Sequence, residues 1–418
     1  MVILPKERLR HAALFLAGAS AVTDLVSIFA CHTLLIAATL ALLLSRPTLR
    51  FPPVMLPLLL FMAGTVISML LDDEPSLGLK QVKKFFVFLM LIVVYNTFRK
   101  LREMFWLAVW WTGAATAQAL WSFYQYVHKQ AQAAAAGRDF YEFYVANRTT
   151  GFLSHWMSFS AVQMFALFVV LSVLFFWPPP RKVAIALAAG AVLILISIVL
   201  GDTRSVWLAT AGGLAFLVWM WRPKMLLLLP VLAAAGLVVA PVGVRERVKS
   251  IYQPHSTADK PNTTLDSNLH RYVTMRTGIA MIQAHPWFGL GPEIVNRDFR
   301  KWVPPDIPRP LPDGYYGHLH SIYIHYAAER GVPTMLMMMW FLVKIVLDFL
   351  RGLRPASAGQ RAFLCAGIAV VIGILLEGFF ELNLGDSEPL GMFLAVVACG
   401  YVALAQEPEP EEICLQSC

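Results

Sequence analysis

Long apolar runs follow one another along this chain, and they constrain its fold more than any other feature. A helix that crosses a bilayer needs about 20 mostly apolar residues. Only 14% of the 418 residues are charged, against about 25% in soluble domains. The sequence therefore predicts an all-α polytopic membrane protein with about 12 transmembrane helices: two tightly connected ones within 12–45, then others at about 52–71, 84–98, 105–127, 157–177, 183–201, 204–221, 225–244, 332–350, 362–380 and 389–406.

Basic residues are unevenly distributed between the connections. If the N-terminus is cytoplasmic, the connections on that side carry Arg and Lys at 46–50, 99–102, 181–182, 222–224 and 351–361. The opposite connections are poorer in cations or hold acids such as Asp24 and Asp202, although Lys80, Lys83 and Lys84 form an exception. The positive-inside rule thus predicts that both termini are cytoplasmic. The first apolar run has no cleavage site of a signal peptide, so we expect it to be retained.

Two connections on the outer side are long, at 128–156 and 245–320, and segments of this length are functional or disordered. In the second, Asp266 and Ser267 suit a helix N-cap, and the apolar spacing predicts a helix at about 267–285. Five prolines within 302–314 predict a stiff extended cover rather than a packed domain. The chain then divides into N-terminal helices at 1–244 (about nine spans), the large loop at 245–320, three C-terminal spans within 321–406 and an acidic tail at 407–418.

Several classes of function are disfavoured by the same sequence. The net charge of +8 comes from scattered basic residues, with no basic stripe and interleaved aromatics, so nucleic acid is not an expected partner. No phosphate-binding glycine loop and no D-x-D pair for a metal-bound nucleotide is present, and we expect no cofactor. The five cysteines have no metal-ligand spacing: Cys31, Cys365 and Cys399 lie in apolar spans, and Cys414 and Cys418 lie in the tail.

Arginines fall at predicted membrane boundaries on the outer side, where ionisable groups are costly and therefore candidates for function. Arg204 stands between two apolar spans, so we expect it at a tight turn where its planar donors could bind an anionic lipid head group or a pyrophosphate. Snorkelling or pairing with Asp202 is the alternative. Arg271 lies near the start of the loop helix, where anions are favoured. Arg276 lies about 140° around that helix and could equally belong to a solvated face.

Two histidines and a serine lie where the large loop runs back into an apolar helix, at His318, His320 and Ser321. An imidazole has an ordinary pKa of about 6.5 and accepts a proton near neutral pH. Interfacial polar residues without chemistry are the alternative. The H-x-H spacing could form part of a zinc site, but Glu329, four residues after His325, is the sole nearby acid with supporting spacing. No metal is therefore expected.

Two stretches of the sequence resemble motifs of a known family. His320-Ser321, nine residues and Gly331-Val-Pro-Thr334 look like the signature of O-antigen ligases. The stretch from Arg271 to His285-Pro286-Trp-Phe-Gly289-Leu-Gly291 resembles a segment of the wider ligase and O-antigen polymerase superfamily. The expected topology agrees, with about twelve helices and a large loop before the signature. The resemblance covers most of the chain.

Further arginines extend this resemblance. Arg204 in Thr-Arg-Ser and Arg148 in Asn-Arg-Thr-Thr-Gly-Phe are similar to the other outer-face arginines of that superfamily. Met275 departs from the pattern, because many relatives have Trp there, and this puts a stacking role at that position in doubt.

The resemblance implies a glycosyltransferase of the bacterial inner membrane. Its donor would be O-antigen linked to undecaprenyl pyrophosphate, its acceptor a sugar hydroxyl of lipid A-core, and its active site would face the periplasm among membrane lipids. His320 would act as general base. Arg204 and Arg271 would neutralise the pyrophosphate, a task that Mg²⁺ performs in many other transferases. Direct displacement would invert the anomeric configuration without a metal or a covalent intermediate.

Secondary candidates and rival functions accompany this interpretation. Arg148, Arg276, His318 and Ser321 are the secondary candidates for the site. We expect His318 to point away from His320, because it lies two residues away on a helix or turn, and Ser321 to orient or cap rather than attack. The nearest rival function is an O-antigen polymerase that joins two carrier-linked glycans. A rival of another class is a flippase for lipid-linked oligosaccharides, which would place polar groups through the membrane midplane.

Overall fold

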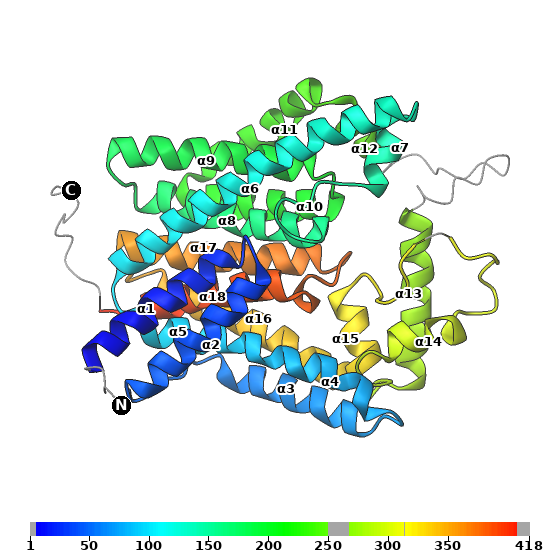
Figure 1. Cartoon of the computed structure of the whole chain (residues 1–418), viewed down its shortest axis with the longest axis horizontal. Helices are drawn as coiled ribbons and strands as arrows, with labels where there is room; N and C mark the ends of the chain where they lie inside the picture. Colours follow the sequence, from blue (N-terminus) through cyan, green and yellow to red (C-terminus); the bar gives the residue numbers. More distant parts are fainter. Residues whose placement is uncertain (1–5, 250–266, 313, 408–418) are drawn as a thin grey trace.

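A computed structural model describes residues 6–249, 267–312 and 314–407, and every regular element in these ranges is helical (Figure 1). The predicted N-cap residue Asp266, both tail cysteines and the acidic tail after Glu407 lie outside the described residues. The predicted all-α class is confirmed for the described part. The N-terminal elements are α1 (Lys6–Thr23), α2 (Ile28–Leu44), α3 (Met55–Leu70), α4 (Pro75–Lys83), η1 (Lys84–Phe88), α5 (Leu89–Thr97), α6 (Leu101–Ala135) and α7 (Phe140–Ala146).

The remaining elements follow α7 along the chain. They are α8 (Trp156–Phe176), α9 (Arg181–Leu200), α10 (Arg204–Trp221), η2 (Pro223–Leu227), α11 (Leu228–Val239), α12 (Val242–Lys249), α13 (Ser267–Ala284), α14 (Ile294–Trp302), α15 (Ile322–Arg330), α16 (Val332–Gly352), α17 (Ala358–Glu377), η3 (Asn383–Gly385) and α18 (Ser387–Leu404).

Five helices within the described residues are long and apolar enough to cross a membrane, namely α8, α9, α16, α17 and α18. Shorter apolar helical segments at Ile28–Leu44, Met55–Leu70 and Pro223–Val239 accompany them. The chain is therefore a multi-pass membrane protein. The number of twelve spans stays a prediction, because several apolar helices are shorter than a full crossing by this measure.

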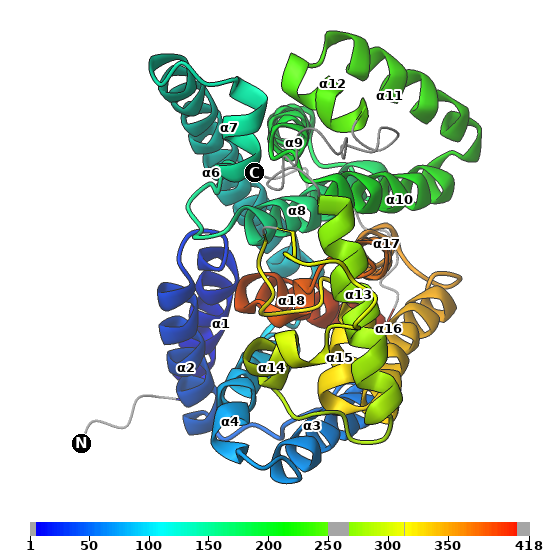
Figure 2. The ribbon, with the colours of Figure 1, turned by 90° about the vertical axis from the view of Figure 1, so that its right-hand side faces the viewer.

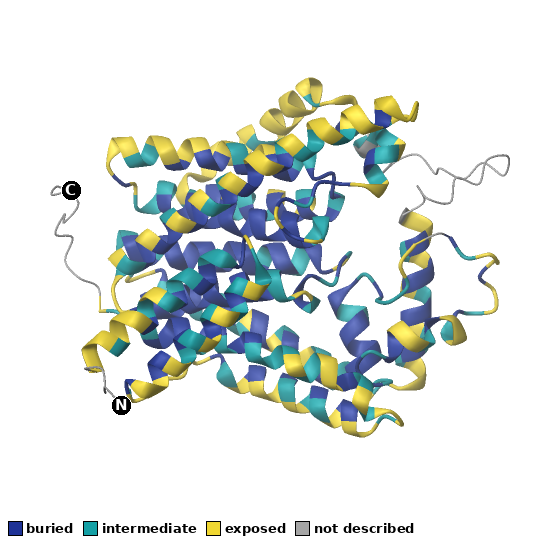
Figure 3. Ribbon diagram, in the orientation of Figure 1, coloured by how far each residue is buried: buried dark blue, intermediate teal, exposed yellow. Residues whose placement is uncertain are grey.

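The centre of the bundle is formed by α17 and α18 (Figures 1 and 2), and α17 packs against α8, α10, α16 and α18. Most residues of α8 and α18 are buried, whereas only 33% of the apolar window of α9 and of α16 is buried. Exposed positions are frequent on the outer helices (Figure 3), and many of the exposed residues are large and apolar. A helix that is apolar on its outer face is suited to contact lipid.

The two ends of the bundle differ in character. The start of α1 and the end of α18 lie at the left end in Figure 1, and α13 and α14 lie at the opposite end. Seen from that end, α13, α14 and α15 lie over the ends of the bundle helices (Figure 2). The side of the membrane on which this end lies stays a prediction.

The described residues 267–312 and 314–320 of the large loop form a packed cap on the bundle. The predicted helix at about 267–285 corresponds to α13, but α14 was not expected from the sequence. Its buried residues Ile294, Val295 and Phe299 occupy one face of a mostly charged helix. The cap has a hydrophobic core of its own, to which Val303 and Ile307 of the proline-rich segment contribute. The expectation of an extended cover without a core is therefore wrong, because apolar residues between the prolines are buried.

Other boundaries differ from the expected spans for local reasons. Helix α6 continues to Ala135 through the alanine-rich segment that was expected to be a loop, because alanine has the highest helix propensity. The expected span at 84–98 consists of η1 followed by α5, and the one at 225–244 consists of η2, α11 and the start of α12.

Candidate active site

The two motifs of the sequence bind each other and hold the cap on the bundle. The segment after α13 runs along the junction of α15 and α16 and forms three backbone hydrogen bonds: Leu290 N–H to Ala328 O (2.9 Å), Gly291 N–H to Glu329 O (2.9 Å) and Val332 N–H to Pro286 O (2.8 Å). Gly331 has a φ of +83°, and a Cβ there would overlap the carbonyl of Trp287. Gly331 therefore allows the close approach of the two backbones.

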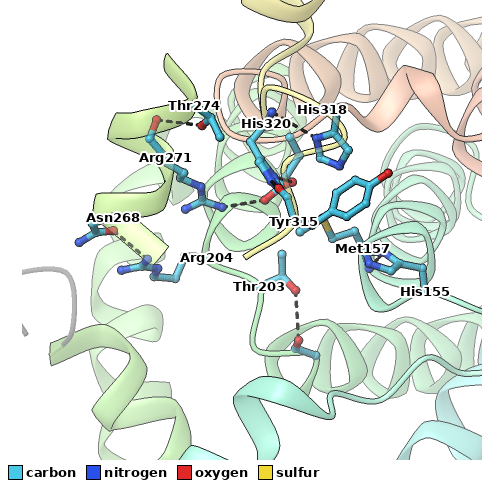
Figure 4. Close-up of polar contacts among 12 residues, drawn as sticks. His155, Met157, Thr203, Arg204, Asn268, Arg271, Thr274, Tyr315, His318 and His320 are labelled. Carbon is cyan, nitrogen blue, oxygen red and sulfur yellow. Dashed lines mark hydrogen bonds and ion pairs between the residues drawn. The ribbon is translucent and has the colours of Figure 1, made fainter. Parts of the chain in front are cut away.

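His320 lies directly before α15, in the left-handed conformation with a φ of +48°. Its side chain is 12% exposed. Its Nδ1 lies 3.2 Å from Oε2 of Glu381, and its Nε2 lies 3.2 Å from the carbonyl oxygen of Tyr315 (Figure 4). Its backbone N–H donates to Nδ1 of His318 at 3.2 Å. The strained backbone thus aims the imidazole at a carboxylate.

Both partners of the His320 ring are hydrogen bond acceptors. A carboxylate and a carbonyl each need a donor, so the two contacts are satisfied when both ring nitrogens carry a proton. To act as a base, the ring must present an unprotonated Nε2 to a group other than the Tyr315 carbonyl, while Nδ1–H remains bonded to Glu381.

Glu381 connects His320 to Arg271. Its Oε1 accepts a hydrogen bond from Nη2 of Arg271 at 2.7 Å, and its side chain is 2% exposed. Burial opposes ionisation of this carboxyl, but the hydrogen bond with His320 and the positive charges of Arg271 and His320 outweigh it and lower the pKa of Glu381 to about 2. The carboxylate is therefore charged at any physiological pH.

Two further histidines surround His320. The ring centroid of His318 is 4.1 Å from that of His320, and the centroid of His270 is 4.9 Å away. Burial, together with the charge on His320, lowers the pKa of His318 to about 3 and that of His270 to about 4. Both are neutral near pH 7. His318 does not point away from His320 as expected, because the left-handed conformation at His320 folds its backbone N–H onto the His318 ring.

Arg204 occupies the tight turn that the sequence predicts. Asp202 has a φ of +51°, and Arg204 is the first residue of α10. Its Nη2 donates to Oδ1 of Asn268 at 2.9 Å. Asn268 lies in the first turn of α13, three residues before Arg271. Arg204 therefore contacts the first turn of α13, the helix that also carries Arg271 (Figure 4).

The segment that contains Arg148 is attached to the same turn through Tyr144. Tyr144 of α7 donates its hydroxyl hydrogen to the carbonyl of Leu200, just before the turn that holds Arg204, at 2.6 Å. Arg148 is 8% exposed, and its guanidinium lies 5.3 Å from the ring centre of Trp156. Its position is close to the site and stabilised by a cation–π contact.

Two secondary candidates have other roles in the structure. Arg276 donates to Tyr272 Oη at 2.7 Å and pairs with Asp306 at 2.9 Å on the exposed side of α13. Ser321 is the buried N-cap residue of α15, and its side chain makes no capping hydrogen bond. The expectation that Arg271 and Arg276 need not share a face is confirmed.

Histidine and acidic side chains near the site are the possible ligands of a metal ion. Within the described residues, no three His, Cys, Asp or Glu side chains are placed to hold a metal ion. The H-x-H pair instead serves contacts within the protein, and His325 Nε2 lies 3.3 Å from Oε2 of Glu329.

Residues 189–339 match the model of a protein family described as O-antigen ligase. The match supports a relation of this part of the chain to the O-antigen ligase and polymerase superfamily. A search of curated proteins found no match. The matched range includes Arg204, Arg271 and His320; it begins after Arg148 and ends before Glu381.

Sequence reasoning missed three residues of the candidate site, namely Glu381, Tyr315 and His270. Glu381 was noticed only as one acid of an outer connection. A usable signal was present, because it directly follows the predicted apolar span at about 362–380, where a carboxylate is costly unless it is paired.

Proposed function

We propose that this protein transfers O-antigen from undecaprenyl pyrophosphate to a sugar hydroxyl of lipid A-core. The observation that carries the proposal is the connected set His320, Glu381 and Arg271, which joins a candidate base to a candidate pyrophosphate ligand through one buried carboxylate. The family match supports glycan transfer in general. The positive-inside pattern supports cytoplasmic termini and a site at the periplasmic face of the inner membrane.

The chemical step is a direct displacement at the anomeric carbon. With His320 neutral and its proton on Nδ1, the acceptor hydroxyl takes the place of the Tyr315 carbonyl at Nε2 and gives its proton to that nitrogen. Its oxygen forms a bond to the anomeric carbon as the bond from that carbon to the pyrophosphate oxygen breaks. The electron pair leaves with undecaprenyl pyrophosphate, and the configuration is inverted. Glu381 keeps Nδ1 protonated and stabilises the imidazolium that forms.

Arginine charge replaces metal charge in this proposal. Arg271 uses one nitrogen for Glu381, and its side chain is 27% exposed, so further donors remain for a phosphate. Arg204 lies at the first residue of α10, where the helix dipole also favours an anion. Activity in excess chelator tests this point. Loss of activity that one divalent ion restores would contradict it.

The decisive experiment reconstitutes purified protein with carrier-linked glycan and lipid A-core and follows the product. The His320→Ala variant, at equal protein level and equal unfolding temperature, is expected to lose about 10²- to 10⁴-fold in turnover, the usual contribution of a general base. Near-normal turnover would remove His320 from the mechanism.

An O-antigen polymerase is the second candidate, because the matched superfamily includes both activities. The same assay separates them. Ligation moves glycan onto lipid A-core, whereas polymerisation lengthens the carrier-linked chain when no lipid A-core is present.

A further inference from the structure

A cavity of about 170 Å³ is lined by Tyr315 and His318, which both lie beside His320. Its wall is formed by parts of α4, α8, α14 and α15 and by the connection between α17 and α18. Neither Arg204 nor Arg271 lines it, whereas Glu381 does. Glu381 therefore forms part of the wall between the cavity and the arginine side of the site.

One buried carboxylate in the wall lacks part of its hydrogen bonding. Glu377 is fully buried, and its Oε2 accepts from Asn383 at 3.2 Å. Its Oε1 has no hydrogen bond partner among the described residues. An unsatisfied buried polar atom is costly and calls for an explanation. A donor on a bound molecule, such as a hydroxyl group, would satisfy it.

The lining is rich in acidic side chains, which disfavour an anion. Five of them line the cavity, from Glu293, Glu329, Glu377, Glu381 and Asp386. Lys84 is the lysine of the lining, and it donates to the carbonyl of Gly385 at 2.8 Å. A pyrophosphate would be repelled here and attracted to the arginine side. Amide groups of Gln81, Asn296 and Asn383 add neutral donors and acceptors.

The size and polarity of the cavity fit a small polyhydroxylated group. Its volume of about 170 Å³ is below the roughly 300–1,000 Å³ of pockets that enclose a drug-sized ligand. Carboxylates and amides are suitable partners for sugar hydroxyls, since a carboxylate accepts only and an amide both donates and accepts.

We propose that this cavity is the acceptor subsite and binds one uncharged sugar ring through Glu377, Asp386 and Asn296. The proposal rests on the proposed function and deepens it, because it assigns donor and acceptor to opposite sides of the His320–Glu381 pair. Tyr315 lines the cavity, and its carbonyl occupies Nε2 of His320. A sugar hydroxyl that enters from the cavity and replaces this carbonyl reaches the base directly.

The test measures acceptor and donor dependence separately in the reconstituted enzyme. Glu377→Gln keeps the shape of the side chain and replaces one of its oxygens by an amide nitrogen, and Asn296→Ala shortens an exposed side chain. We expect the acceptor KM to rise about tenfold in Glu377→Gln and about threefold in Asn296→Ala, as for lost hydrogen bonds. The donor KM should stay within about twofold. Asp298→Asn is the matched control, because this α14 carboxylate does not line the cavity.

A binding titration keeps the proposal separate from catalysis. Delipidated core oligosaccharide is titrated into the His320→Ala protein with and without Glu377→Gln, and the heat of binding is measured. Weaker binding in the double variant supports the acceptor subsite. Unchanged binding and an unchanged acceptor KM would overturn it. If the wild-type protein transfers no glycan at all, the proposed function fails, and the titration still decides whether the cavity binds a sugar.

Discussion

His320 contacts two acceptors at once, and only one of these contacts is compatible with a base. The Glu381 contact at Nδ1 leaves Nε2 available, whereas the Tyr315 contact occupies it. The neutral rings of His318 and His270 pack around this imidazole and add no charge near pH 7. In the proposed reaction, the function of His320 as a base therefore depends on a single exchange, in which a substrate hydroxyl replaces the Tyr315 carbonyl.

The Glu381→Gln variant tests the partner of His320. The amide keeps the size of the side chain but loses the charge that stabilises the imidazolium, so we expect kcat to fall by about 10²-fold or more. The acceptor KM should change less than kcat. Glycan transfer by the purified variant, measured across pH, checks this. A kcat within about threefold of wild type would show that Glu381 does not position the base.

The depressed pKa of Glu381 also predicts how stability depends on pH. Its pKa is about 2 in the folded protein, against an ordinary value of 4.5. The stabilisation is fully present above about pH 4.5 and is lost as the pH falls towards 2. The unfolding temperature in detergent should therefore drop more for wild type than for Glu381→Gln between about pH 6 and 3.5. Equal drops in both proteins would contradict the assigned contacts.

Helix α13 carries two arginines with different partners. Arg271 faces Glu381 in the site, and Arg276 faces Asp306 at the exposed surface. We expect Arg271→Ala to lower kcat/KM for the donor by about 10²- to 10³-fold, the usual cost of removing a charge-stabilising donor. Arg276→Ala should stay within about twofold. Initial rates at varied donor concentration distinguish them, and equal losses would mean that both arginines serve the donor.

The backbone hydrogen bonds between the segment after α13 and the junction of α15 and α16, which we call the backbone clamp, should be sensitive to a single methyl group. Gly331→Ala adds a Cβ against the Trp287 carbonyl at a positive φ, and we expect a loss of at least about 2 kcal/mol in stability. Gly113→Ala is the control, because no atom lies within 4 Å of its added Cβ and alanine favours a helix. Thermal unfolding in detergent measures both. Hydrogen exchange should rise at Leu290 and Gly291 in the first variant alone.

Elements with a strong apolar pattern were predictable, and those built on tertiary contacts were not. The helices at 157–177, 183–201 and 204–221 agree with α8, α9 and α10 to within about a residue or two at each end. Helix α14 was missed because it is mostly charged and has only three buried apolar side chains. These pack against the other parts of the cap, a contact that the sequence alone does not predict. Likewise, Arg204, Arg271 and His320 were chosen as candidates because they are ionisable residues at predicted membrane boundaries. The contact of Glu381 with Arg271 and His320 depends on the tertiary structure, which brings the end of α17 close to α13.

For the whole molecule, the orientation across the membrane is a prediction that labelling can test. Cys31, Cys365 and Cys399 are buried, so a chain with Cys414→Ser and Cys418→Ser gives a low background. We expect a membrane-impermeant maleimide to label Arg300→Cys on α14 from the periplasm. Arg354→Cys, in the exposed connection between α16 and α17, should react only after the inner membrane is opened. The reverse pattern would place the site in the cytoplasm.

The backbone clamp has a consequence for exchanging parts between relatives. The segment with Gly289 and Gly291 and the segment with Gly331 are far apart in sequence, yet each supplies half of one set of backbone hydrogen bonds. A graft that replaces the cap but keeps a host junction of α15 and α16 would join two halves that were not matched to each other. Transplanting specificity therefore requires moving both segments as one unit, even though one belongs to the cap and the other to the bundle.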